Sequence, residues 1–240
     1  RHPEFDGLNL TWESLEGIVK HNGRITSNIP FHTNQYNKKH NLFLEKSPYL
    51  ESQIASISDD VAYNNHDIED ALRAKLINFN SLKDINYFKE IINDLKKTYN
   101  KIEESRLIYQ MLRVSISKMV NDIIEQSINN IKFNKIKSVK DVQENQDFLI
   151  TMSKKMKEDC NTINEFLFVH MYNHKKLREK RLKVEEITKK LFKYFLKNFN
   201  KLPKDWFIQE QREDKNRIIC DYISGMTDRY ASKLYKSIYE

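Results

Sequence analysis

The stretch Tyr49-Leu-Glu-Ser-Gln-Ile-Ala-Ser-Ile-Ser-Asp-Asp-Val-Ala-Tyr-Asn-Asn-His-Asp67 decides the fold class of this 240-residue chain. Its apolar residues recur every three or four positions, the spacing of one helix face; they are Leu50, Ile54, Ile57 and Val61. Ser47-Pro48 precedes them as a helix start, with serine as N-cap and proline in the first turn. We expect this helix to reach about Asn64, a break over 64–67, and a second helical stretch over 68–76.

The rest of the chain shows the same helical spacing. It has only four glycines and four prolines, so few residues interrupt regular structure. We expect helices over 11–21, 81–99, 102–131, 142–172, 177–199 and 209–239, the first capped by Thr11 and the last bent at Gly225. Residues 22–46 are polar and irregular and are predicted to form a long surface loop. No stretch alternates like a strand, so the predicted class is all-α with long packed helices.

Composition and charge exclude several classes of protein. Apolar residues make up 39% and charged residues 31% of the chain, which excludes disordered, collagen-like and disulfide-scaffold proteins. Lys and Arg number 41 against 34 Asp and Glu, and the two signs alternate as on solvated helix faces. No apolar run approaches the ~18 residues of a membrane span. The chain begins Arg1-His2-Pro3 without a signal-peptide pattern, so we expect a cytoplasmic protein and a start inside something longer.

The cysteines and histidines show no convincing metal-binding pattern. Cys160 and Cys220 lack a partner at CxxC spacing, and we expect both to be buried small hydrophobic residues. His170 and His174 stand at i and i+4 without a neighbouring carboxylate, so we expect a packing or surface role for them. The sequence contains no P-loop, dinucleotide-binding, zinc-protease or EF-hand motif.

Asp59, Tyr63 and Asp67 form the most informative chemical pattern. Their i, i+4, i+8 spacing places them on one side of a continuous helix over about 12 Å, whereas Asp60 points elsewhere. Carboxylates are hard oxygen ligands for divalent cations, and a phenol donates a hydrogen bond to a phosphate oxygen. Two interpretations follow from the pattern: a metal and phosphate site on a bundle wall, or a solvent-facing helix end with Tyr63 in the core.

Three blocks of the sequence resemble the bacterial deoxynucleoside triphosphate triphosphohydrolases, the dGTPase-like branch of the HD superfamily. They are Phe5–Gly23 (FDGLNLTWESLEGIVKHNG), Ser52–Ala74 (SQIASISDDVAYNNHDIEDALRA) and Cys220–Ala231 (CDYISGMTDRYA). They occur in the family's order and span nearly the whole chain. The resemblance implies the C-terminal portion of an HD-type helical fold. Residues 1–240 would form one region, with about 1–80 completing the HD core and about 81–240 forming a C-terminal helical layer.

The resemblance also implies a reaction. The family hydrolyses a dNTP, such as dGTP, to the deoxynucleoside and inorganic tripolyphosphate. Its divalent metal (Mg, Mn or another transition metal) is held by a His, an adjacent His-Asp pair and a later Asp, and polarises a phosphoryl oxygen. The later Asp falls on Asp59, and the family's phosphate-contacting Tyr and following Asp fall on Tyr63 and Asp67. Family members form hexamers or similar rings, so a homo-oligomer is expected.

The chain departs from the family pattern upstream of Asp59. No His-Asp pair precedes this residue, and His66-Asp67 lies downstream in a different block. We therefore expect the chain to be inactive alone, with its catalytic residues unassigned, unless an N-terminal half supplies the other ligands in trans.

Two pairs of charged residues have weaker assignments. Asp228 and Arg229 are expected to form a buried ion pair that anchors the last helix; in the alternative, Arg229 approaches substrate or a neighbouring subunit. Lys20 and His21, at the end of the first helix, are expected at the surface.

The rival hypothesis is a non-catalytic helical module for binding or assembly, with nucleic acid as one partner. The net charge of +7 is compatible with this role. It predicts salt-sensitive binding that is indifferent to Asp59→Ala.

Overall fold

The computed structural model describes residues 2–5, 7–207 and 214–239, and the part of the chain that it describes is helical without a strand. The chain divides into two compact units, residues 1–171 and 172–240. The all-α prediction is confirmed. The boundary expected near residue 80 falls inside the first unit, and the single-region assignment stays a prediction. No helix in the described ranges is both long and apolar enough to cross a membrane.

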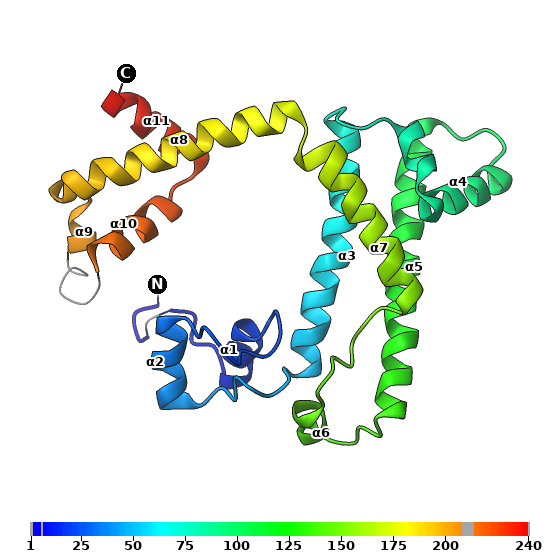
Figure 1. The fold of residues 1–240 in the computed structure, drawn as a ribbon, viewed down its shortest axis with the longest axis horizontal. Coiled ribbons are helices and arrows are strands. Elements are labelled where there is room, and N and C mark those ends of the chain that lie inside the picture. The colour runs from blue at the N-terminus through cyan, green and yellow to red at the C-terminus, as the bar shows by residue number, and fades with distance from the viewer. Residues whose placement is uncertain (1, 6, 208–213, 240) are drawn as a thin grey trace. The chain divides into compact units, whose positions relative to one another are not determined.

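In the first unit, two long helices, α3 (Leu50–Arg73) and α5 (Glu104–Phe133), pack together, and α7 (Lys154–Leu167) packs on α3 (Figure 1). Helix α4 (Asn86–Thr98) packs on α5. Shorter elements complete the unit: α1 (Trp12–Val19), α2 (Phe31–His40), a 3-10 turn (Phe79–Asp84), α6 (Val139–Glu144) and a π-helical turn that follows α7 (Phe168–Tyr172). Helix α2 corrects the predicted loop over 22–46.

Helix α3 is continuous, so the break predicted over residues 64–67 is wrong. Asn64 and Asn65 suggested a turn, but both are buried within the helix. The Asn65 amide donates to the Val61 carbonyl at 2.8 Å and contacts the Met119 sulfur at 3.3 Å. Packing against α5 therefore overrides the weak helix propensity of asparagine.

The start of α3 also differs from the prediction. Tyr49 is the N-cap, without a side-chain capping bond. Ser47, the predicted cap, instead donates its hydroxyl to the Asn145 carbonyl at 2.7 Å. A serine that precedes a proline thus joins two distant segments of the chain.

Gln53 holds the irregular segment 145–153, which connects α6 to α7. Its Oε1 accepts hydrogen bonds from the backbone N–H groups of Leu149 (2.9 Å) and Ile150 (3.1 Å), and its Nε2 donates to the Pro48 carbonyl (2.9 Å). The side chain is 2% exposed. Because the backbone N–H groups of a buried segment outside a helix or strand must find acceptors, such partners are needed here.

A buried ion pair holds α1 in place. Glu16 and Lys20 are both fully buried and contact each other one turn apart. The Lys20 ammonium also donates to the carbonyl oxygens of Phe43 (3.2 Å), Lys46 (3.1 Å) and Ser47 (3.4 Å). The expectation that Lys20 lies at the surface is therefore wrong. The N-cap predicted at Thr11 is confirmed, since its hydroxyl accepts from the Ser14 N–H at 3.3 Å.

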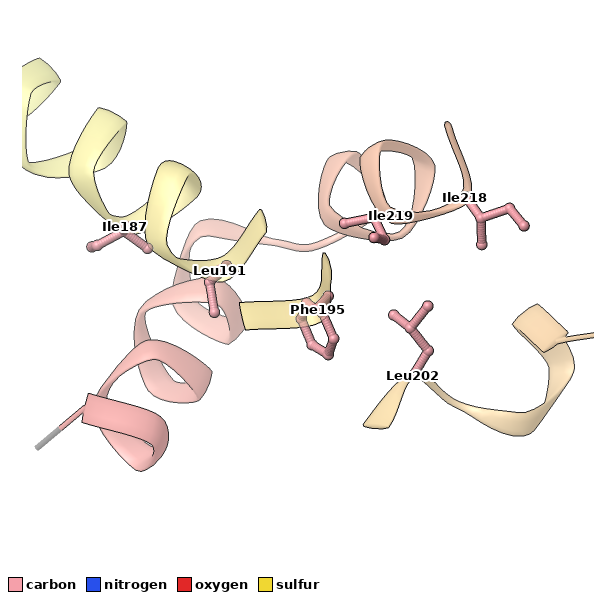
Figure 2. Close-up of a cluster of buried hydrophobic side chains, with 6 residues drawn as sticks. All are labelled: Ile187, Leu191, Phe195, Leu202, Ile218 and Ile219. Carbon is pink, nitrogen blue, oxygen red and sulfur yellow. The ribbon is translucent and has the colours of Figure 1, made fainter. Parts of the chain in front are cut away.

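In the second unit, α10 (Lys215–Ser224) and α11 (Asp228–Tyr239) pack on α8 (Lys175–Lys197). A 3-10 turn (Phe199–Lys201) and α9 (Lys204–Phe207) follow α8. Figure 2 shows its buried cluster, which consists of Ile187, Leu191, Phe195, Leu202, Ile218 and Ile219. Gly225 ends α10, which confirms the predicted bend. Residues 209–213 of the predicted last helix lie outside the described residues.

Gln53→Ala is expected to lower the free energy of unfolding by about 2–3 kcal/mol, since it leaves two buried backbone N–H groups without an acceptor. Urea denaturation followed by circular dichroism measures the change. Gln35→Ala, at an exposed position of α2, is the control and should shift stability by no more than about 0.5 kcal/mol. Equal effects of the two variants would contradict the proposed role of Gln53.

Lys20→Met is expected to destabilise the chain by about 3–5 kcal/mol, because it leaves the Glu16 carboxylate buried without a counter-charge. The double variant Glu16→Leu/Lys20→Met removes both charges and should recover most of this loss. Lys38→Met, at an exposed position, is the matched control. A double variant as unstable as the single one would show that the Lys20–carbonyl bonds, and not the buried charge, dominate.

Candidate functional site

One face of α3 carries the three predicted site residues. Because the helix is continuous, Asp59, Tyr63 and Asp67 lie on one side, about 6 Å apart along the axis. Asp59 is exposed, Asp67 is half-buried, and the Tyr63 side chain is 56% exposed. The interpretation that put Tyr63 in the core is therefore wrong. A carboxylate and a phenol are both open to a ligand on this face.

The electrostatics of this face are dominated by acidic groups. Partial desolvation raises the pKa of Asp60, the neighbouring Asp59 carboxylate raises it further, and His21 lowers it. Burial raises the pKa of the Cys160 thiol on α7 to about 11, and Asp159, Asp122 and Asp60 contribute to this rise. Burial is the main cause of both shifts, and neighbouring carboxylates add to them, whereas His21 acts in the opposite direction on Asp60.

These residues do not by themselves make a metal site. Among the residues that the structure describes, no group of three or more His, Cys, Asp and Glu side chains is arranged to hold a metal ion. Asp59 could contribute one carboxylate ligand, but the remaining ligands would have to come from another polypeptide segment. The described residues thus fit one ligand of a metal centre but not a complete set of ligands.

The histidines examined as metal ligands have other roles. His66 lies 3.7 Å from Glu69 in a surface pair. His170 packs on Phe166, with ring centroids 4.4 Å apart. His174 is the N-cap of α8 and accepts a hydrogen bond from the Lys176 N–H at 3.3 Å. His170 has the expected packing role, whereas the capping role of His174 was not predicted.

A cavity of about 1090 Å³ lies beside the start of α3. Its walls come from α1, from the first two turns of α3, from the end of α5 and from α6. Residues of α1 and α3 that line it include Glu13, Glu16, Ile18, Leu50, Glu51 and Ala55. His21 also lines it. Since Ala55 is one turn before Asp59, the cavity opens on the same face of α3 as the predicted site.

Glu16 is the site feature that the sequence analysis missed. The Oε1 atom contacts Lys20, whereas Oε2 has no hydrogen-bond partner although the side chain is fully buried. Desolvation, followed by the Glu16, Glu13 and Glu51 carboxylates, raises the pKa of the nearby Tyr49 phenol. The Glu-x-x-x-Lys spacing was visible in the sequence, but this spacing is common on exposed helices and gave no sign of burial.

The predicted residues of the second unit lie at its surface. Asp228 and Arg229, at the start of α11, are both exposed, so the expectation that they form a buried ion pair is wrong. An ion pair in α10 joins Arg217 and Asp221 at 2.9 Å. Cys220 is exposed, which corrects its predicted burial, whereas Cys160 is buried as expected. A substrate-contacting role for Asp228 and Arg229 stays a prediction.

Comparison with known proteins finds similar sequences over the whole chain. The model of the phosphohydrolase-associated domain family matches residues 150–237. A deoxyguanosinetriphosphate triphosphohydrolase-like protein of Bartonella henselae is 35% identical over 249 residues, covering 100% of this chain and 62% of the relative. Proteins of the same name from Rickettsia bellii and Rickettsia typhi are each 36% identical over 241 residues, covering 99% of this chain and 63% of the relative.

The chain thus spans somewhat less than two thirds of the length of these curated relatives. The match extends over both structural units and includes the helix that carries Asp59, Tyr63 and Asp67. Over its whole length, this chain is similar to the deoxyguanosinetriphosphate triphosphohydrolase-like proteins, and its residues 150–237 match the model of the phosphohydrolase-associated domain family.

Proposed function

We propose that this chain contributes part of a site that hydrolyses deoxynucleoside triphosphates to the deoxynucleoside and inorganic tripolyphosphate. The observation that carries the proposal is the face of α3 with Asp59, Tyr63 and Asp67, in a chain similar over its whole length to proteins named for this activity. In this proposal Asp59 is a metal ligand, and Tyr63 and Asp67 contact the substrate.

The charge of the α3 face supports a cation requirement. The exposed carboxylate of Asp59 would repel a triphosphate if no positive charge intervened. A divalent cation, when bound, would neutralise triphosphate charge and polarise a phosphoryl oxygen. Asp59 is exposed and can offer its carboxylate to such an ion. The acidic face is thus suited to a metal–phosphate complex and unsuited to a free phosphate.

Tyr63 and Asp67 would position the substrate. The exposed phenol of Tyr63 can donate its hydroxyl hydrogen to a phosphate oxygen. Asp67, one turn further on, can accept a hydrogen bond from a sugar hydroxyl or an ordered water. Because both side chains rise from one rigid helix, their spacing is set by the helix and does not depend on a loop.

In this proposal, residues other than those of the given chain complete the site. The other metal ligands would come from an N-terminal segment, in the same polypeptide or in trans, and a homo-oligomer is a further proposed state. Residues 1–240 alone are expected to give no dNTP turnover with added Mg²⁺ or Mn²⁺.

Asp59→Asn is expected to lower kcat/KM for dGTP at least about a hundredfold, since disturbing even an outer partner of a metal ligand costs 10–100-fold. The assay supplies the N-terminal segment of the Bartonella henselae relative, fused before Arg1 or added in trans, and measures tripolyphosphate release. Asp94→Asn, an exposed carboxylate on α4 that pairs with Lys97, is the control. Turnover by Asp59→Asn at the parent rate would refute the assignment.

A second candidate function, contact with nucleic acid, is favoured by one observation. Residues 175–183, in the first half of α8, carry six basic and one acidic side chains. All six basic residues are exposed. This cluster departs from the alternating charge of the other helices and could track a phosphate backbone.

The two candidates give opposite results in one comparison. A nucleic-acid module would bind a single-stranded oligonucleotide with strong salt dependence and would be indifferent to Asp59→Asn. A hydrolase part would lose restored turnover on this substitution. Fluorescence anisotropy at 50 and 200 mM salt, run beside the turnover assay, separates them.

A further inference from the structure

A cavity of about 400 Å³ lies within the second unit, where α10 and α11 pack on α8. Residues that line it include Tyr194, Lys201, Tyr222, Tyr230, Leu234 and Ile238. They come from the end of α8, from the 3-10 turn after it, from α10 and from α11. The volume lies within the range of about 300–1,000 Å³ that is usual for small-molecule sites.

The cavity is built on the buried core of the second unit. Phe195 lines it and also belongs to the buried cluster shown in Figure 2. The Tyr222 ring packs edge-on against Phe195, with ring centroids 5.3 Å apart, and its centroid lies 5.5 Å from that of Trp206. Because these rings hold one another in place, Tyr222 has a fixed position at the cavity wall.

The phenol groups at the cavity can donate to an anion. The Tyr222 and Tyr230 hydroxyls lie 3.4 Å apart, which is long for a hydrogen bond between two hydroxyls, so both can turn their hydrogens toward one ligand oxygen. Desolvation, followed by the contact with Tyr230, raises the pKa of Tyr222 to about 12. The Tyr222 phenol therefore stays protonated at neutral pH and remains a donor.

The charge around the cavity also favours an anion. Lys201 lines the cavity, is exposed, and forms no ion pair with any described residue. Among the described residues, no Asp or Glu lines this cavity, whereas three Glu residues line the cavity beside α1. Residues 172–240, the second unit, contain 18 basic and 10 acidic side chains. An anionic ligand is therefore attracted to this unit as a whole.

The cavity also offers apolar contact. Leu234 and Ile238 stand one turn apart on α11, and Pro203 lies between α8 and α9; all three line the cavity. The Tyr194 ring adds an aromatic surface. Aromatic and apolar side chains of this kind pack on planar rings, including nucleobases. A ligand that uses both kinds of group carries a planar ring and an anionic group.

We propose that this cavity binds a nucleoside monophosphate. The phosphate group accepts hydrogen bonds from the Lys201 ammonium and from the Tyr222 and Tyr230 hydroxyls, and its several oxygens and high negative charge suit these donors. The base packs on the apolar wall with Leu234 and Ile238. The described residues that line the cavity all belong to the second unit, so this inference does not rest on the proposed hydrolysis at α3.

The test titrates residues 1–240, labelled with ¹⁵N, with adenosine monophosphate, adenosine and inorganic phosphate. The monophosphate is expected to shift resonances of cavity residues and to bind at least about tenfold more tightly than either fragment, since each fragment uses only one kind of contact. Equal affinities for the monophosphate and either fragment, or no binding of the monophosphate, would overturn the proposal.

Two pairs of variants locate the binding. Lys201→Met is expected to weaken monophosphate binding at least about tenfold, whereas Lys204→Met, exposed on α9 and not a cavity residue, should leave it unchanged. Ser237→Phe places a ring in the cavity from an exposed position of α11 and should abolish binding, whereas Ser224→Phe, exposed at the end of α10, should not. Equal effects within both pairs would refute the cavity as the site.

The basic segment 175–183 of α8 could attract the same nucleotide by charge alone. Binding at that exposed segment would be largely lost between 50 and 200 mM salt and would be indifferent to Lys201→Met and Ser237→Phe. Binding in the cavity is expected to persist at 200 mM salt and to depend on both residues. A nucleotide affinity that ignores both cavity variants would assign the nucleotide to the basic segment and overturn the proposal.

Discussion

The buried ammonium group of Lys20 is the constraint on which the site region depends. It lies without solvent contact between the Glu16 carboxylate and three carbonyl oxygens of the segment 43–47. A buried charge is tolerated only when partners surround it, so the end of α1 and the chain before α3 have few other arrangements. The contacts of the Lys20 ammonium together fix the positions of Glu16, His21 and the residues that lead into α3.

Other buried polar groups specify the packing around this centre. Ser52 donates its hydroxyl to the Gly17 carbonyl at 2.9 Å, which ties α3 to α1. Gln53, at the next position, holds the segment 145–153, and Asp122 of α5 accepts from the Ser153 N–H at 2.8 Å. These bonds join segments that are up to about a hundred residues apart, so they specify the fold more than they increase its stability.

The proposed site on α3 would be divided between segments. Asp59 offers one carboxylate on a rigid helix, but no metal-binding group forms among the described residues. A site built in this way depends on the correct docking of a second segment, which couples assembly to chemistry. The acidic character of the face strengthens the coupling, because a triphosphate without its cation would be repelled.

By itself the sequence determined the helical class, the Thr11 cap, the bend at Gly225 and the face with Asp59, Tyr63 and Asp67. These features are local, and side-chain periodicity and capping chemistry report local structure directly. The blocks that resemble the family are each contiguous in the sequence, so the comparison of these blocks with the family requires no tertiary structure.

Only the tertiary structure decided which polar residues are buried. Asn64 and Asn65 resembled a turn, Ser47 a cap and Lys20 a surface residue, because their partners lie on other segments of the chain. Cys220 resembled a core residue but is exposed, since the helix face that it occupies is not covered in its unit. Periodicity shows which residues share a face, whereas the burial of that face depends on contacts between segments far apart in the sequence.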